Sequence, residues 1–190
     1  MKQLTTKQIA VTGIFLALAI CSQFFKNASV FLTGSIINLL LLLTVYYAGL
    51  GCALLLGVIT PLTSFLITGS PLIATVPLIL PGIMLGNAVY CLGFCFLVRL
   101  FHKGTGHSPI LVITVRLLAV GFASLVKAGV MALCIVKLLI PMFGTNLPEK
   151  LVNVAKVQFS VVQLITACIG GGLASVLMVR IKKEALEKSV

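Results

Sequence analysis

Acidic side chains are nearly absent from this sequence. Its 190 residues include three carboxylates, Glu149, Glu184 and Glu187, against 14 lysines and arginines. Charged residues make up 9% of the chain and hydrophobic residues 60%, whereas charged residues make up about 25% of a soluble domain. So little polar sequence cannot cover a globular core in water. The chain is therefore predicted to be an all-α integral membrane protein.

Groups for catalysis and for metal binding are also scarce. Both histidines, His102 and His107, lie in one polar turn, and no carboxylate lies within a long apolar segment. No general base or set of metal ligands can therefore be placed inside the membrane. A G-x-x-x-x-G-K-[ST] phosphate-binding loop is absent as well. We expect no enzyme activity, no cofactor and no metal, and any ATP hydrolysis must come from partner subunits.

Basic residues are plentiful and give the chain a net charge of +11. Most of them flank or interrupt apolar segments, and no basic patch is interleaved with aromatic residues. We therefore expect no nucleic-acid partner. The six cysteines also lie in apolar segments, which predicts reduced thiols within helices rather than the disulfide framework of a small secreted domain.

The apolar segments predict a single bundle of six membrane-spanning helices. The tract from Asn27 to Val98 contains no charged residue, and its length suits three spans of roughly 20 residues each. Pro61 should kink the third span, and a short helix is expected after Pro148. The predicted spans are residues 8–25, 33–47, 50–67, 76–101, 110–140 and 157–179.

Six spans divide the basic residues unequally between the two sides of the membrane. One side carries Lys26, Lys150 and Lys156, and the other carries Lys2, Lys7, Arg99, Lys103, Arg180, Lys182, Lys183 and Lys188. Basic residues favour the cytoplasmic side. The sequence therefore predicts a multi-pass protein of the cell membrane with both termini in the cytoplasm.

Lys127 lies at the centre of the fifth span, midway through the 20 residues between Arg116 and Lys137. A lysine at this depth costs roughly 2.5–3.5 kcal/mol on insertion scales, and such residues usually mark a functional site. Its side chain is too short to reach either surface, and no span offers a carboxylate partner. We therefore expect an anionic ligand to supply the missing negative charge.

The other polar side chains of the spans concentrate in the outer half and the centre of the membrane. This distribution predicts a pocket that is open to the outside and closed towards the cytoplasm. The candidate substrate-binding residues are Asn38, Asn87, Lys127, Lys137, Gln158 and Gln163. Buried amides also often bond neighbouring helices, Lys127 could contact backbone carbonyls, and Lys137 could anchor the chain at the membrane surface.

Small residues occupy the cytoplasmic half of the first span. Gly13 and Ala17 form a small-x-x-x-small pair with Ala10 one turn before it. Such a pair allows two membrane helices to approach closely. It is a candidate for docking a partner helix, although small residues in membrane helices also pack within their own bundle.

The chain as a whole resembles the substrate-binding S component of an energy-coupling factor (ECF) vitamin transporter. The segment Gly13–Ala17 matches an A-x-x-x-A pair of that family with glycine at the first position, and Thr60-Pro61 and Pro77–Asn87 resemble its proline-rich approach to the fourth helix. The resemblance implies capture of a vitamin from outside. It also implies docking on a membrane scaffold subunit that carries two ATPase subunits, and toppling in the membrane to release the cargo.

Pantothenate is the first candidate vitamin, because its carboxylate, hydroxyls and amide match the basic and amide residues above. Nicotinate, lipoate and folate are anionic alternatives, although the absence of tryptophan leaves no evident platform for stacking a large flat ring. A function of another class also stays open: a membrane assembly or channel subunit in which Lys127 is purely structural.

Overall fold

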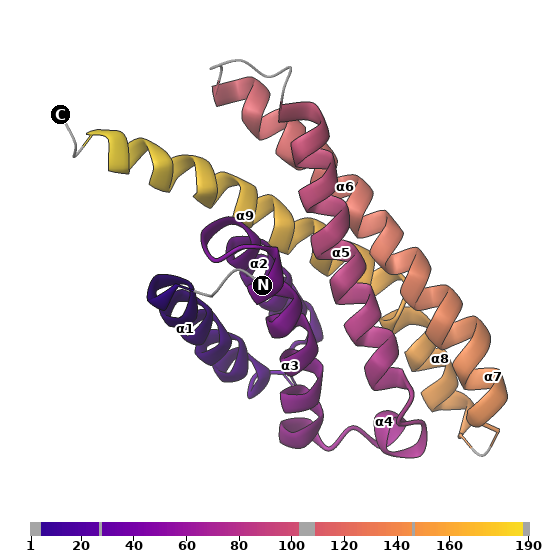
Figure 1. The fold of residues 1–190 in the computed structure, drawn as a ribbon. Coiled ribbons are helices and arrows are strands. Elements are labelled where there is room, and N and C mark those ends of the chain that lie inside the picture. The colour runs from indigo at the N-terminus through magenta and orange to yellow at the C-terminus, as the bar shows by residue number, and fades with distance from the viewer. Residues whose placement is uncertain (1–4, 27, 103–108, 146, 188–190) are drawn as a thin grey trace.

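The structure is a computed structural model that describes residues 5–26, 28–102, 109–145 and 147–187 (Figure 1). Every regular element within these ranges is a helix. In chain order they are α1 (Thr6–Gln23), α2 (Val30–Tyr47), α3 (Leu50–Thr68), α4 (Pro71–Thr75), α5 (Ile79–His102), α6 (Pro109–Met131), the π-helix η1 (Ala132–Leu139), α7 (Ile140–Phe143), α8 (Glu149–Gln158) and α9 (Val161–Glu187).

Six helical segments are long and apolar enough to cross a membrane, which confirms that part of the predicted fold class. They are Thr6–Gln23, Val30–Tyr47, Leu50–Thr68, Ile79–Phe101, Ile110–Phe143 and Glu149–Arg180. The first five agree with the predicted spans to within three residues at each end. The cytoplasmic location of both termini remains a prediction from the distribution of basic residues.

Polar capping residues determine where the first two helices begin, which is two and three residues before the predicted spans. Thr5 Oγ1 accepts a hydrogen bond from the Gln8 backbone N–H at 3.3 Å, and the Thr5 N–H donates to Gln8 Oε1 at 2.9 Å. This reciprocal pair is a capping box. The Ser29 hydroxyl likewise accepts from the Leu32 N–H at 3.2 Å and begins α2 at Val30.

The sixth span differs from its prediction. The short helix expected after Pro148 is present as α8, and residues 157–179 lie within the sixth spanning segment, but a break that was not predicted interrupts the helix there. The helix stops at Gln158, Phe159 has φ −96° and ψ 9°, and α9 starts at Val161. No glycine or proline marks this interruption, so composition alone does not reveal it.

The helices pack as neighbouring pairs (Figure 1). Helix α2 packs on α9, α5 on α6, and α6 on α9, while α1 contacts α2 and α3 at one edge. The α2–α9 crossing is very close at Gly170, where a Cβ atom would overlap the Ser35 carbonyl oxygen and lie 2.8 Å from the Leu39 nitrogen. A glycine is therefore required where these two backbones meet.

Two apolar clusters lie on either side of the polar residues. The first includes Leu41, Leu56, Phe94, Ala119 and Met178 and joins α2, α3, α5, α6 and α9. The second joins α4, α5, η1, α7 and α8 around residues such as Ile73, Ile79, Ile135 and Phe159. Buried polar side chains lie between the clusters, and they form the candidate site.

Candidate functional site

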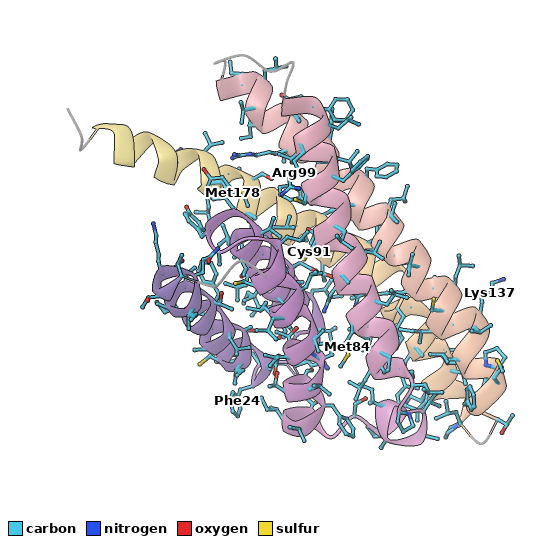
Figure 2. All side chains as sticks on the ribbon, viewed as in Figure 1. Phe24, Met84, Cys91, Arg99, Lys137 and Met178 are labelled. Atoms are coloured by element: carbon cyan, nitrogen blue, oxygen red, sulfur yellow. The ribbon has the colours of Figure 1, made fainter. Side chains whose placement is uncertain are left out.

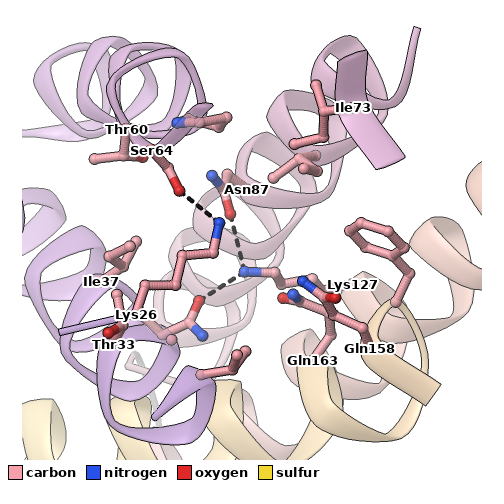
Figure 3. A pocket seen from close by; sticks show the side chains of 16 residues that line it. Lys26, Thr33, Ile37, Thr60, Ser64, Ile73, Asn87, Lys127, Gln158 and Gln163 are labelled. Carbon is pink, nitrogen blue, oxygen red and sulfur yellow. Dashed lines mark hydrogen bonds between the residues drawn. The ribbon is translucent and has the colours of Figure 1, made fainter. Parts of the chain in front are cut away.

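A cavity opens between α2, α3, α5 and α6, next to the junction of α8 and α9 (Figure 3). Its volume is about 90 Å³ for the centres of water-sized molecules. One buried water needs about 10–15 Å³ on this measure, so the cavity has room for several waters or one small ligand. Its lining comprises Lys26, Val30, Thr33, Gly34, Ile37, Asn38, Thr60, Pro61, Ser64, Ile73, Ile83, Asn87, Lys127, Gln158, Phe159 and Gln163.

Lys127 is the central polar group of this cavity. Its side chain is 2% exposed. The ammonium donates a hydrogen bond of 2.6 Å to Asn38 Oδ1 and one of 2.9 Å to Asn87 Oδ1 (Figure 3). Among the described side chains it has no carboxylate partner, so its contacts are with oxygen dipoles and carry no full negative charge. An ammonium has three N–H donors, and one remains for a ligand.

Pro61 determines how Asn87 is oriented. Proline has no N–H, so the carbonyl of Gly57, four residues earlier in α3, lacks its partner within the helix. The Asn87 Nδ2 donates to this Gly57 carbonyl at 3.0 Å. Because the amide nitrogen is held there, the Asn87 oxygen faces Lys127. Gly57 also permits the approach, since a Cβ at this position would lie 3.2 Å from the Asn87 Cβ.

The Asn38 side chain is likewise oriented by a hydrogen bond from its amide nitrogen, here to a residue of α9. Its Nδ2 donates to Thr166 Oγ1 at 3.4 Å, and the Thr166 hydroxyl donates to the Val162 carbonyl at 2.8 Å. The chain of hydrogen bonds thereby links α2, α3, α5, α6 and α9 around one ammonium. Each amide has a donor and an acceptor role, which is how buried polar groups are ordinarily satisfied.

The Tyr90 ring lies next to Lys127 and belongs to the first apolar cluster. Lys127 Nζ lies 5.2 Å from the ring centroid, within the range of a cation–π contact. The Tyr90 hydroxyl donates to the Ala167 carbonyl at 2.8 Å. Tyr90, Ala123 and Ala167 are fully buried. The side of Lys127 that faces Tyr90 is therefore tightly packed and belongs to the first apolar cluster.

Lys26 is a second ammonium at the same cavity, and the sequence reasoning missed it as a ligand residue. It follows α1, and its Nζ donates to Ser64 Oγ of α3 at 2.6 Å. Partial burial lowers the pKa of Lys26 below the ordinary value for a lysine. Figure 3 shows the Lys26 and Lys127 ammonium groups directed into the same space. The signal available in the sequence was a lysine three residues after Gln23, at the end of the first span.

Thr60 adds to the lining a hydroxyl group that forms no hydrogen bond with the described residues. Its side chain is 1% exposed, and its Oγ1 has no hydrogen-bond partner among the described residues. A buried hydroxyl without a partner costs about 1–3 kcal/mol, so this atom favours a ligand or water that can bond to it. Two ammonium groups and one free hydroxyl are the groups a carboxylate or another oxygen-rich anion would need.

Five of the six predicted substrate-binding residues line this one cavity, and Lys137 does not. Asn38, Asn87 and Lys127 are joined by hydrogen bonds, while Gln158 and Gln163 are half-buried and line the cavity beside the α8–α9 junction. Lys137 is exposed on η1 and lies away from the cavity (Figure 2). Lys137 follows Lys127 by ten residues, which is not a whole number of helical turns, so the two side chains do not share a helix face.

The predicted docking residues lie on the outer face of α1. Ala10, Gly13 and Ala17 are all exposed. A Cβ at Gly13 would meet no atom within 4 Å. These small residues are therefore not packed against the part of the chain that the structure describes, and a helix of another protein could approach them closely.

The lining suits the binding of a small, oxygen-rich anion. Its polar side chains come from the segment after α1 and from α2, α3, α5, α6, α8 and α9. Comparisons of the chain with protein-family models, with curated proteins and with solved structures found no match, so its function has to be inferred from the chemistry of this cavity.

Proposed function

We propose that this protein captures a small anionic vitamin as the S component of an ECF-type importer, with pantothenate as the first candidate. The observation that carries the proposal is the unneutralised charge of the cavity. Lys26 and Lys127 both line it, and its described lining contains no acidic residue. A cation inside a membrane protein needs a counter-charge or a dense set of acceptors. A ligand carboxylate would provide that charge.

The shape and lining of the cavity favour a compact ligand. Phe159 is the one aromatic residue of its described lining, so a large ring system such as folate would have little to stack on. Pantothenate has a carboxylate for the ammonium groups. It also has hydroxyl and amide groups, which match Thr60, Gln158 and Gln163. Nicotinate and lipoate share the carboxylate and lack most of these additional groups.

A panel of vitamins tests the assignment directly. Purified protein should be stabilised against heat by pantothenate, and not by pantothenol, the neutral alcohol in which the carboxylate is replaced. The other vitamins of the panel are nicotinate, lipoate and folate. If another anionic vitamin stabilised the protein instead, the assignment as an S component would stand and that vitamin would be its ligand. Stabilisation by neutral or cationic compounds alone would contradict the role assigned to Lys127.

Docking on a partner is the second part of the proposal. The exposed face of α1, with Gly13 and Ala17, is where the scaffold subunit would approach, and the two ATPase subunits would supply the energy. Gly13→Leu should abolish co-purification of these three subunits, because the leucine side chain fills the space that a partner helix needs. Gly121→Leu on α6, also exposed and with no atom within 4 Å of its Cβ, is the matched control and should leave the complex intact.

The competing proposal is that Lys127 has a purely structural role, and one observation favours it. The ammonium already bonds to both Asn38 and Asn87, and these bonds join several helices without any ligand. In that case the protein would be a membrane assembly or channel subunit. Such a subunit should co-purify without ATPases and should show no stabilisation by any vitamin of the panel.

A further inference from the structure

A second cavity lies between α2, α5, α6 and α9, at the end of the molecule away from α4 and α8. Its volume is about 590 Å³ for the centres of water-sized molecules, much larger than the first. Figure 2 shows Arg99 of α5 and Met178 of α9 in the region where these helices diverge. Arg116 of α6 also lines it.

Its two arginines come from the paired helices α5 and α6. Arg99 lies three residues before the end of α5 and is exposed, while Arg116 lies two turns into α6 and is half-buried. The Arg116 guanidinium carbon is 5.2 Å from the centroid of the Tyr46 ring, a cation–π contact that holds the side chain at the wall. Neither guanidinium donates a hydrogen bond to another residue whose side chain is described, and Glu149 lies on α8 at the other end.

The remaining wall of this cavity is apolar. It is formed mainly by Val45, Phe94, Val98, Val112, Val115 and Met178. A free inorganic anion would bind to the guanidinium groups but would make no apolar contact with this wall. A molecule with an anionic head and a hydrocarbon chain would match both parts, because guanidinium binds phosphate through paired N–H donors and apolar side chains accept an acyl chain.

We propose that this cleft binds one anionic phospholipid. Its phosphodiester lies on Arg99 and Arg116, and one acyl chain lies along the apolar wall between α5, α6 and α9. The predicted topology places the cleft in the cytoplasmic leaflet, where a basic recess between membrane helices is suited to anionic headgroups. The site is separate from the vitamin cavity, and the proposal does not depend on which vitamin, if any, the first cavity binds.

The test compares three probes on the purified full chain in a neutral detergent. Phosphatidylglycerol should raise the thermal unfolding temperature and remain bound in native mass spectrometry at one molecule per protein. Phosphatidylcholine, which has the same chains and no net charge, should do neither. Glycerol phosphate, which supplies the phosphate without a chain, should also do neither. Equal effects of the two lipids, or an equal effect of glycerol phosphate, would overturn the proposal.

Variants locate the site. Arg99→Gln and Arg116→Gln should each weaken the apparent affinity for phosphatidylglycerol about fivefold, the contribution of one basic residue to an anionic lipid. Arg180→Gln is the matched control, because Arg180 is an exposed arginine of α9 that does not line the cleft. Arg99 is exposed, so its variant is expected to fold even if Arg116→Gln does not. Unchanged affinity in Arg99→Gln, or an equal loss in Arg180→Gln, would place the lipid elsewhere.

Discussion

Lys127→Met should reduce the affinity for the anionic vitamin on the order of a hundredfold and leave the protein folded. Hydrogen bonds to charged groups contribute about 1.5–3 kcal/mol each, and the upper end corresponds to roughly two orders of magnitude in binding. Methionine has a similar length and no charge. The change leaves the Asn38 and Asn87 oxygens without their donor, but it also removes the cost of burying an ammonium.

The control for this variant is Lys137→Met, the same substitution at a lysine that is exposed and outside the cavity. Titration calorimetry with pantothenate, and with whichever vitamin the panel selects, should show a loss for Lys127→Met alone. Binding within threefold of the unmodified protein in both variants would mean that Lys127 is structural.

Asn38→Asp tests the same charge argument without removing the lysine. The substitution is nearly isosteric and places a carboxylate against the Lys127 ammonium, which is 2.6 Å from Asn38 Oδ1. The protein would then provide its own counter-charge, so an anionic ligand should bind at least tenfold more weakly although the fold is kept. Unchanged or tighter binding of the anion would show that the charge of Lys127 is not what attracts it.

Gly170→Ala should destabilise the protein severely and is the largest stability effect expected from a single methyl group. An added Cβ would overlap the Ser35 carbonyl and lie 2.8 Å from the Leu39 nitrogen and 2.9 Å from the Asn38 Cβ. Two of these atoms are backbone, which cannot rotate away as a flexible side chain does. Overpacking ordinarily costs about 1–3 kcal/mol, and we expect a value at or above the upper end here.

The matched control is Gly172→Ala, two residues further along α9, where a Cβ would meet no atom within 4 Å. It should leave the thermal unfolding temperature unchanged or raise it, since alanine is favoured over glycine within a helix by about 0.5–1 kcal/mol. A fall of similar size in both variants would show that the effect does not come from the close α2–α9 crossing at Gly170. Because Gly170 faces Asn38, its variant should also weaken ligand binding.

Hydropathy and charge were sufficient to locate the six membrane segments, because an apolar run near 20 residues has few other structures available to it. They were not sufficient at residues 157–161. There the apolar pattern continues while the backbone turns from α8 into α9 at Phe159. They also did not predict the π-helix η1, in which Lys137 lies, because no glycine or proline in residues 132–139 marks it.

The site was predictable to the extent that it follows from the chemistry of single residues. A charged group at mid-membrane requires polar neighbours, so Lys127 could be identified, and the buried amides Asn38 and Asn87 were the natural candidates. Lys26 was not identified, because the turn after α1 brings it back over α3 to Ser64. A contact between residues so far apart in the chain cannot be read from the spacing of either.

The hydrogen bond between Asn87 and the Gly57 carbonyl has a consequence for sequence divergence. Pro61 leaves that acceptor open, and Asn87 occupies it at 3.0 Å. A residue with an N–H at position 61 would restore the bond within α3 and compete with the asparagine for the same oxygen. The two positions are therefore expected to covary among related chains: those that lose the proline should also replace the asparagine, and with it the acceptor for the buried lysine.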